Sequence, residues 1–255
     1  MSLPEGNSFQ PTHMHPDPPV RWTWLDLAAF AIFFGLTVLF LPLGVIQAMR
    51  VFDPTIVPAD LSGVQQVLLQ GLMDVLLIGF IYFLVRVVHK RSFVETIHWY
   101  RNHQYRTGFL IGVGTSLAMS VLIVSSFFPP SEPPPIEKLI TSSGSLWVFA
   151  IFGIGVAPLV EEIIFRGFLF KTFSDVAGSS FAVTATAALF TLLHIPQLWG
   201  SWAGIALIFV VGYVLGTVRA RSNSVIPPFI IHTAYNTMLF GVFALSTVVQ
   251  KGLQT

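Results

Sequence analysis

Seven long apolar runs constrain how this chain can fold. They lie at 22–49, 61–88, 108–128, 146–170, 180–194, 202–218 and 226–249. A helix needs roughly 20 apolar residues to cross the hydrocarbon core of a bilayer. The runs therefore predict an all-α, polytopic transmembrane bundle of about seven spans. An eighth element would have to come from 93–105 or 131–142, which look too polar to span and suit the membrane interface.

The composition supports a membrane protein and excludes several classes of function. Only 10% of residues are charged and 54% are hydrophobic, whereas soluble domains average about 25% charged residues. A net charge of +1 gives no field that would attract nucleic acid. The absence of cysteine excludes disulfides and thiol chemistry.

The chain divides into a tail and one domain. Residues 1–20 contain five prolines and few large apolar residues, which is typical of a disordered tail. Residues 21–255 are expected to form a single membrane-embedded helical domain.

Basic residues predict the orientation of this domain. With the N-terminus inside, most Lys and Arg residues outside the spans fall on the cytoplasmic side, as the positive-inside rule requires. We therefore expect a multi-pass cell-membrane protein with a cytoplasmic N-terminus. The residues on that side would be Arg21, Arg86, Lys90, Arg91, Arg101, Arg106, Lys171, Arg219 and Arg221.

A few ionisable residues lie deep inside the predicted spans. They are Asp74, Glu161, Glu162, His194 and His232. Because charge is costly to bury in a bilayer, each is a candidate functional residue, and its partner has to be found.

Helical spacing separates the two adjacent glutamates. Glu162 lies four residues before Arg166, the favoured order for a helical ion pair, which we expect to be partly buried near the cytoplasmic end. Glu161 points about 100° away from Glu162 and lacks that arginine as a partner. A carboxylate left unpaired in an apolar span suits the role of a general base.

Two further pairs are spaced to share a helix face. These are Phe190 with His194, and His232 with Asn236. Counted at about 1.5 Å per residue, the Glu, Asn and His side chains lie roughly 9 to 21 Å from the cytoplasmic ends of their spans. We expect these groups to meet in a cavity that opens toward the cytoplasm.

The second run carries a polar face with two interpretations. Gln66, Gln70 and Asp74 recur every four residues, so they share one side of a helix. We favour hydrogen bonding between helices, and the alternative is one wall of a water-filled cavity.

Two small-xxx-small pairs predict close helix packing. One is Gly212 with Gly216, and the other is Gly108 with Gly112.

Three motifs taken together resemble a known family. They are Glu161-Glu162-x-x-Phe165-Arg166-Gly167, Phe190-x-x-x-His194 and His232-x-x-x-Asn236. Their order and spacing resemble those of the CAAX prenyl endopeptidase and bacteriocin-processing family, also called the ABI family of intramembrane proteases. The resemblance covers about 146–239 and implies a catalytic core at about 146–240.

The resemblance implies a glutamate-dependent intramembrane endopeptidase. Because Asn236 would be an unusual metal ligand, we expect no cofactor. Glu161 would activate the attacking water with help from His194, while His232 and Asn236 would form the oxyanion hole. Glu162 and Arg166 would support the site, together with Phe190. The implied partners are membrane lipid and a protein or peptide substrate, which in this family can be prenylated. No nucleic acid partner is implied.

Other interpretations of the same residues stay open. Glu161, His194 and His232 could ligate a divalent metal such as zinc, although no His-Glu-x-x-His helix is present. A non-catalytic membrane binding protein would use the same cavity. A proton pathway would also use deep ionisable residues, but the chain has no internal repeat to support a transporter.

Overall fold

A computed structural model describes residues 20–101, 104–130, 132, 135 and 143–252 of the chain. Every regular element in the part that it describes is a helix, as predicted. Six helices are long and apolar enough to cross a membrane, and a seventh, α9 (Ser179–His194), is apolar but shorter. The seven runs therefore correspond to seven helical segments, and the predicted all-α polytopic bundle is confirmed.

The two segments proposed for an eighth element give no further span in the described residues. The first contains only the four-residue helix α3 (Phe93–Thr96). Most of the second, 131–142, lies outside the described residues, as does nearly all of the predicted tail. Val20, the last residue of that tail, is buried in the core.

Polar residues in the sequence set the ends of several helices. Thr23 and Asp26 form a reciprocal capping box at the start of α1 (Trp24–Arg50), and Ser62 does the same with Gln65 at the start of α2 (Gly63–Phe83). These side chains satisfy backbone N–H groups that have no partner within the helix. Asn223, in a left-handed conformation with φ 49°, ends α10 (Trp202–Ser222).

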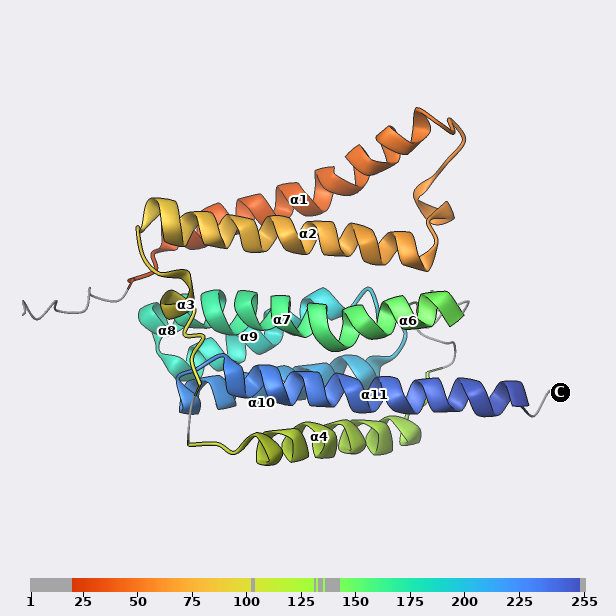
Figure 1. The fold of residues 1–255 in the computed structure, drawn as a ribbon. Helices are drawn as coiled ribbons and strands as arrows, with labels where there is room; N and C mark the ends of the chain where they lie inside the picture. The colour runs from red at the N-terminus through yellow and green to blue at the C-terminus, as the bar shows by residue number, and fades with distance from the viewer. Residues whose placement is uncertain (1–19, 102–103, 131, 133–134, 136–142, 253–255) are drawn as a thin grey trace, which may run out of the picture.

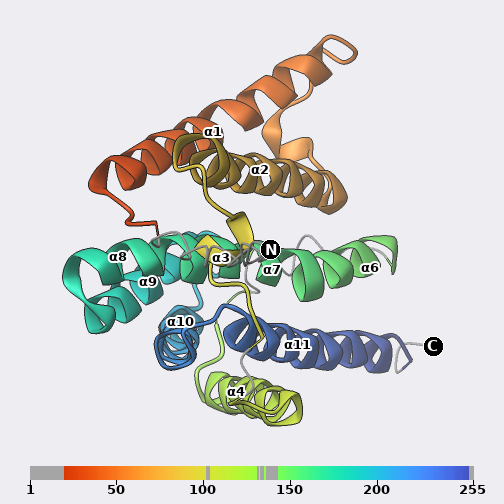
Figure 2. The ribbon, with the colours of Figure 1, turned by 60° about the vertical axis from the view of Figure 1, so that its left-hand side comes forward.

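The helices form three layers (Figures 1 and 2). α1 and α2 pack together on one side, and α4 (Thr107–Phe127) lies along α11 (Ile226–Gly252) on the other. Between them runs the long span that carries the two glutamates, with α9 beside it and α10 packed along α9.

Two π-helical stretches interrupt the long central span. α6 (Ser143–Ile151) passes into a π-helical stretch, η3 (Phe152–Val156), which is followed by α7 (Ala157–Glu162). A second π-helical stretch, η4 (Ile163–Leu169), precedes α8 (Phe170–Ala177). A shorter π-helical stretch, η2 (Leu84–Val88), extends α2.

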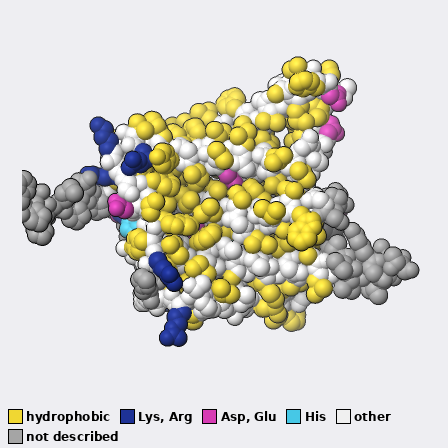
Figure 3. Space-filling model, in the orientation of Figure 1, with side chains coloured by type: hydrophobic (Ala, Val, Ile, Leu, Met, Phe, Trp, Pro, Cys, Tyr) yellow, Lys and Arg dark blue, Asp and Glu magenta, His cyan; other side chains and the backbone are white. Residues whose placement is uncertain are grey.

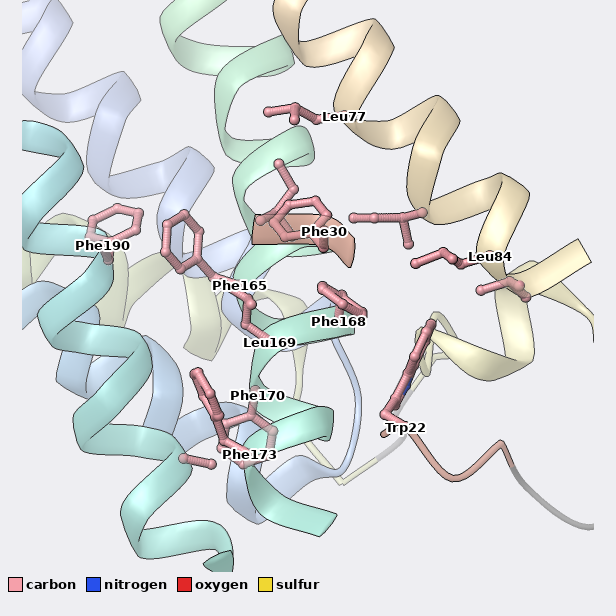
Figure 4. Close-up of a cluster of buried hydrophobic side chains, with 14 of the residues drawn as sticks. Trp22, Phe30, Leu77, Leu84, Phe165, Phe168, Leu169, Phe170, Phe173 and Phe190 are labelled. Atoms are coloured by element: carbon pink, nitrogen blue, oxygen red, sulfur yellow. The ribbon is translucent and has the colours of Figure 1, made fainter. Parts of the chain in front are cut away.

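The main core fixes the central span against its neighbours. Figure 4 shows its aromatic side chains, which include Phe165, Phe168 and Phe190. Trp22 packs edge-on against Phe168 with ring centroids 4.7 Å apart, and Phe30 lies 4.9 Å from the same ring. These contacts join the start of α1 to the helix that carries the glutamates.

One of the two glycine predictions is confirmed and the other is wrong. A Cβ on Gly212 would lie 3.2 Å from Ala187 Cα, and one on Gly216 would lie 3.4 Å from Val183 Cα, so α10 approaches α9 closely. Gly108 and Gly112 have no described neighbour within 4 Å of such a Cβ. The close contact on α4 is made at Gly114 instead, against α11.

The outer surface is apolar between two polar ends. Figure 3 shows hydrophobic side chains over most of one face, with Lys and Arg gathered at one end of the helices. Large side chains such as Leu25, Ile32 and Leu68 are exposed on the surface of the bundle. A surface of this kind suits contact with lipid.

Candidate active site

Glu162 and Arg166 form the ion pair that their spacing predicts. Arg166 Nη1 donates to Glu162 Oε1 over 2.9 Å, and both side chains are 0% exposed. The predicted partial burial is therefore wrong, because the pair lies wholly inside the protein. A buried pair needs further hydrogen bonds to offset the loss of hydration.

Arg166 finds those contacts on two neighbouring helices. Its Nη2 donates to the backbone carbonyl of Gly212 over 3.0 Å. The guanidinium lies 5.0 Å from the centre of the Phe190 ring, a favourable position for a cation over an aromatic face. Gly212 also makes the close contact of α10 with α9, so one residue serves packing and the site.

His232 joins the two glutamates from α11. Its Nδ1 lies 2.9 Å from Glu162 Oε1, and its Nε2 lies 3.6 Å from Glu161 Oε2. Because an ionised carboxylate only accepts hydrogen bonds, Nδ1 carries the proton toward Glu162. Among the ion pairs of the described residues, Arg166 pairs with Glu162, whereas Glu161 has His232 as its neighbour.

The two glutamates differ in how far they reach accessible space. The side chain of Glu161 is 26% exposed, whereas that of Glu162 is 0% exposed. Only the first can meet a water molecule or a substrate directly. Helical rotation thus separates the carboxylates in the way that the sequence predicted.

His194 lies on the other side of Phe190. The two rings are 4.4 Å apart, and the Phe190 ring is also 5.8 Å from His232. His194 Nδ1 lies 2.8 Å from the Phe190 carbonyl, so it donates that proton and leaves Nε2 to accept one. Among the described residues, His194 makes no ion pair with Glu161 within 4.0 Å.

Asn236 lies one turn beyond His232 on α11 and contacts the central span. Its Nδ2 donates to the carbonyl of Gly153 over 2.7 Å. Gly153 belongs to η3, so this bond joins α11 to the first π-helical stretch. The amide group keeps a second N–H for another acceptor.

The polar face of α2 is satisfied locally. Gln70 Nε2 donates to Asp74 Oδ1 over 2.8 Å, and Gln66 Nε2 donates to the Leu61 carbonyl over 2.9 Å. The favoured prediction of bonds between helices is therefore wrong for these two glutamines. Gln66 and Gln70 also line a cavity of about 270 Å³ beside α1, in line with the alternative of a cavity wall.

The site includes a residue that the sequence did not suggest. Arg219 was predicted to lie on the cytoplasmic side of the bundle, yet it is 1% exposed. Its Nε donates to the Arg166 carbonyl over 2.9 Å. It lies seven residues after Gly212, on the same face of α10 as both close-packing glycines, and that spacing could have indicated an inward direction.

The arrangement of the ionisable side chains bears on the metal-dependent alternative. Among the residues that the structure describes, no group of three His, Cys, Asp or Glu side chains is placed to hold a metal ion. The metal-free mechanism stays a prediction, with Glu161, His194 and His232 as the alternative ligand set.

Comparisons with known proteins agree with the motifs. Residues 143–238 match the family described as type II CAAX prenyl endopeptidase Rce1-like. The membrane-embedded CAAX protease MroQ of Staphylococcus aureus (strain USA300) is 24% identical over 135 residues. That alignment covers 51% of this chain and 53% of the relative, so this chain spans about half the length of the curated relative. No solved structure matches the chain.

The matched residues contain all three motifs. The comparisons thus confirm the predicted resemblance: residues 143–238 are similar to CAAX-type prenyl endopeptidases, and the helices are those of a multi-pass membrane protein. The roles of the individual side chains stay predictions.

Proposed function

We propose that this chain is an intramembrane endopeptidase that hydrolyses a peptide bond of a membrane-associated protein or peptide. The observation that carries the proposal is the contact of His232 with both glutamates, 2.9 Å to Glu162 and 3.6 Å to Glu161. It puts a carboxylate, an imidazole and a buried ion pair around one accessible point. This arrangement suits acid–base chemistry.

In this proposal Glu161 is the general base. It is the accessible carboxylate, and it takes a proton from the attacking water as the water's oxygen bonds to the substrate carbonyl carbon. His194 helps to hold this water through its bare Nε2. We propose that the water lies between His194 and Glu161, which make no direct ion pair within 4.0 Å in the described residues.

His232 and Asn236 stabilise the charge that develops on the carbonyl oxygen. Hydrogen-bond donors aimed at an oxyanion are among the largest contributions to acyl transfer. Asn236 has one N–H left after its bond to Gly153. His232 donates Nδ1–H to Glu162, so it serves as an oxyanion donor through Nε2 only as an imidazolium.

Glu162 and Arg166 orient the site without meeting the substrate. Glu162 accepts from both Arg166 and His232 on the same oxygen, Oε1. With His232 as an imidazolium, each glutamate has one cationic neighbour, Arg166 for Glu162 and His232 for Glu161. The proton on Glu161 then passes to the leaving amine as the tetrahedral intermediate breaks down.

We propose that the lipid of a substrate binds in an apolar groove along α11, on the side of that helix that points away from His232 and Asn236. The groove, about 550 Å³ in volume, lies between α4 and α11. Thr233 and Thr237, which follow His232 and Asn236 directly, line its wall together with Ile111 and Met238. A hydrocarbon chain in this groove would hold the attached peptide next to α11.

The proposed orientation places the N-terminus and the open side of the site in the cytoplasm. The collection of Lys and Arg at one end of the helices supports it (Figure 3), since cytoplasmic ends carry an excess of these residues. The chain has no cysteine, so single cysteines can be introduced. Arg221→Cys should react with an impermeant thiol reagent only after the membrane is opened, and Phe52→Cys should react in intact cells. The reverse pattern would overturn this orientation.

The function is tested by cleavage in liposomes. The purified chain is mixed with a peptide that ends in a CAAX-like sequence, either farnesylated or unmodified, and the products are identified by mass spectrometry. We expect a new carboxyl terminus that carries ¹⁸O from labelled water, formed faster from the farnesylated peptide. Equal rates for both peptides would contradict the lipid groove, and the absence of cleavage of either peptide would contradict a CAAX-type endopeptidase.

A further inference from the structure

A second arginine is buried beside the site. Arg219 of α10 is 1% exposed, and its guanidinium lies 5.1 Å from the centre of the Phe170 ring. Its Nε donates to the Arg166 carbonyl over 2.9 Å, and its Nη1 donates to Asn223 Oδ1 over 3.3 Å. Burying a cation inside a membrane protein is costly. A buried arginine with specific hydrogen bonds is therefore a candidate functional residue.

Two residues of α10 hold Arg166 from opposite ends. The Gly212 carbonyl accepts from the tip of the Arg166 side chain, and Arg219 donates to the Arg166 backbone. Gly212 and Arg219 are seven residues apart, about two helical turns on one face. Arg166 is thereby fixed at both its backbone and its guanidinium.

The backbone contact falls inside a π-helical stretch. η4 begins directly after Glu162 and contains Arg166. Such stretches interrupt the regular hydrogen-bond ladder and are frequent at functional sites. A buried carbonyl needs a donor, and Arg219 supplies one to Arg166 at this irregular turn.

Arg219 itself is braced by the turn between α10 and α11. Asn223, which it contacts, accepts at its carbonyl from His98 Nδ1 over 3.2 Å and from the Tyr100 hydroxyl. The Val225 N–H donates to the His98 carbonyl over 3.0 Å. The connection after α3 is thus fastened to the turn that holds Arg219.

We propose that Arg219 is a positioning residue of the site, which fixes Arg166 and, through it, Glu162 and the His232 imidazole. The chain of contacts runs from Arg219 to the Arg166 backbone, from the Arg166 guanidinium to Glu162 Oε1, and from that oxygen to His232 Nδ1. The effect on rate rests on the proposed peptidase function, whereas the effect on the η4 backbone does not.

The test compares Arg219 with a matched arginine on the same helix. Arg221 is exposed and lies two residues further on, so Arg221→Met removes the same charge without touching Arg166. Arg219→Met, Arg219→Lys and Arg221→Met are purified as full-length chains. Peptide cleavage gives kcat and KM, and amide hydrogen exchange is followed in peptides that cover 163–169.

We expect Arg219→Met to lower kcat by about 10- to 100-fold, since small displacements of reacting groups cost this much. KM should stay within about twofold of its original value, because Arg219 does not meet the substrate. Exchange in 163–169 should be faster than in the unmodified chain. Arg219→Lys, which keeps the charge and a donor group, should give values between those of Arg219→Met and the unmodified chain. Arg221→Met should match the unmodified chain in every measurement.

The proposal is overturned if Arg219→Met and Arg221→Met have the same kcat and the same exchange in 163–169. A rise in KM at unchanged kcat also overturns it, because that result describes substrate binding. If Arg219→Met does not fold, Arg219→Lys is judged by the same two measurements. If the unmodified chain cleaves no peptide, the peptidase function fails, and the exchange in 163–169 alone decides whether Arg219 positions Arg166.

Discussion

His232 Nδ1 donates to Glu162 Oε1 over 2.9 Å, the same oxygen that Arg166 contacts. One carboxylate oxygen therefore fixes both a guanidinium and an imidazole inside the bundle. The adjacent carboxylate, Glu161, is left to face accessible space. The two glutamates of one motif thus have different physical situations, and they should respond differently to the same substitution.

Glu162→Gln should destabilise the protein more than Glu161→Gln does. It removes the charge that pairs with Arg166 in a fully buried position, and breaking a buried pair costs about 3–5 kcal/mol. Glu161→Gln alters an accessible side chain without such a pair, so the melting temperature in detergent should change little. Equal losses of melting temperature in the two variants would contradict the separate roles.

Gly114→Ala should weaken the packing of α4 on α11. A Cβ at this position would lie 2.8 Å from Ala234 Cβ and 3.1 Å from the Tyr235 backbone nitrogen. Overpacking of this kind costs about 1–3 kcal/mol. Gly112→Ala is the matched control on the same helix, because no described atom lies within 4 Å of its Cβ. Thermal unfolding of the two variants checks the difference, and a Gly114→Ala variant as stable as Gly112→Ala would refute the close approach.

The helices and the motif residues could be predicted from the sequence, because apolar length and a spacing of four residues fix them locally. The Glu162–Arg166 pair follows from such spacing. The π-helical stretches could not be predicted, since spans that are apolar on nearly every side carry no periodic signal of a change in pitch. The contact of His232 with Glu162 depends on how α11 packs against α7, which no local pattern encodes.

The inward orientation of Arg219 is a second feature that the sequence analysis missed. A basic residue near the end of a span is normally assigned to the cytoplasmic surface by the positive-inside rule. Its neighbour Arg221 follows that rule and is exposed. Arg219 instead turns inward, because the Arg166 carbonyl and Asn223 offer it hydrogen bonds that a surface position would lack.

His98 should make the protein less stable in mild acid. Burial, together with the positive charge of Arg219, lowers the pKa of His98 from 6.5 to about 4. The hydrogen bond to the Asn223 carbonyl opposes this shift, and the smaller effects of Lys171 and Asp175 lower and raise the pKa, respectively. The folded protein therefore holds His98 neutral, and its contribution to stability is complete above about pH 6.5. As the pH falls from there toward 4, His98 binds a proton in the unfolded chain but not in the folded chain, so the free energy of unfolding decreases.

His98→Gln provides the control for this pH dependence. At about pH 7.5 the variant should melt below the unmodified chain, because it lacks the bond from Nδ1 to Asn223. At about pH 5 the difference in melting temperature should shrink. Only in the unmodified chain does protonation of His98 in the unfolded state lower the stability of the folded state. Melting temperatures that keep a constant gap across this range would contradict the shifted pKa.

Cleavage should continue after divalent metals are removed. The proposed chemistry uses Glu161, His194, His232 and Asn236, and the described residues contain no group of three side chains placed to hold a metal. Treatment with a chelator, followed by elemental analysis of the treated protein, should leave the cleavage rate within about twofold. A rate that falls after treatment and returns with added zinc would support the metal-dependent alternative.

The most direct test of the account is Glu161→Gln, measured for both cleavage and binding of the farnesylated peptide in liposomes. This change keeps the size of the side chain and removes its capacity to take a proton from water. The account predicts cleavage reduced by at least about 1,000-fold, a loss typical for a group that performs the chemistry, with peptide binding and melting temperature retained. A Glu161→Gln variant that still cleaves at a comparable rate would contradict the account.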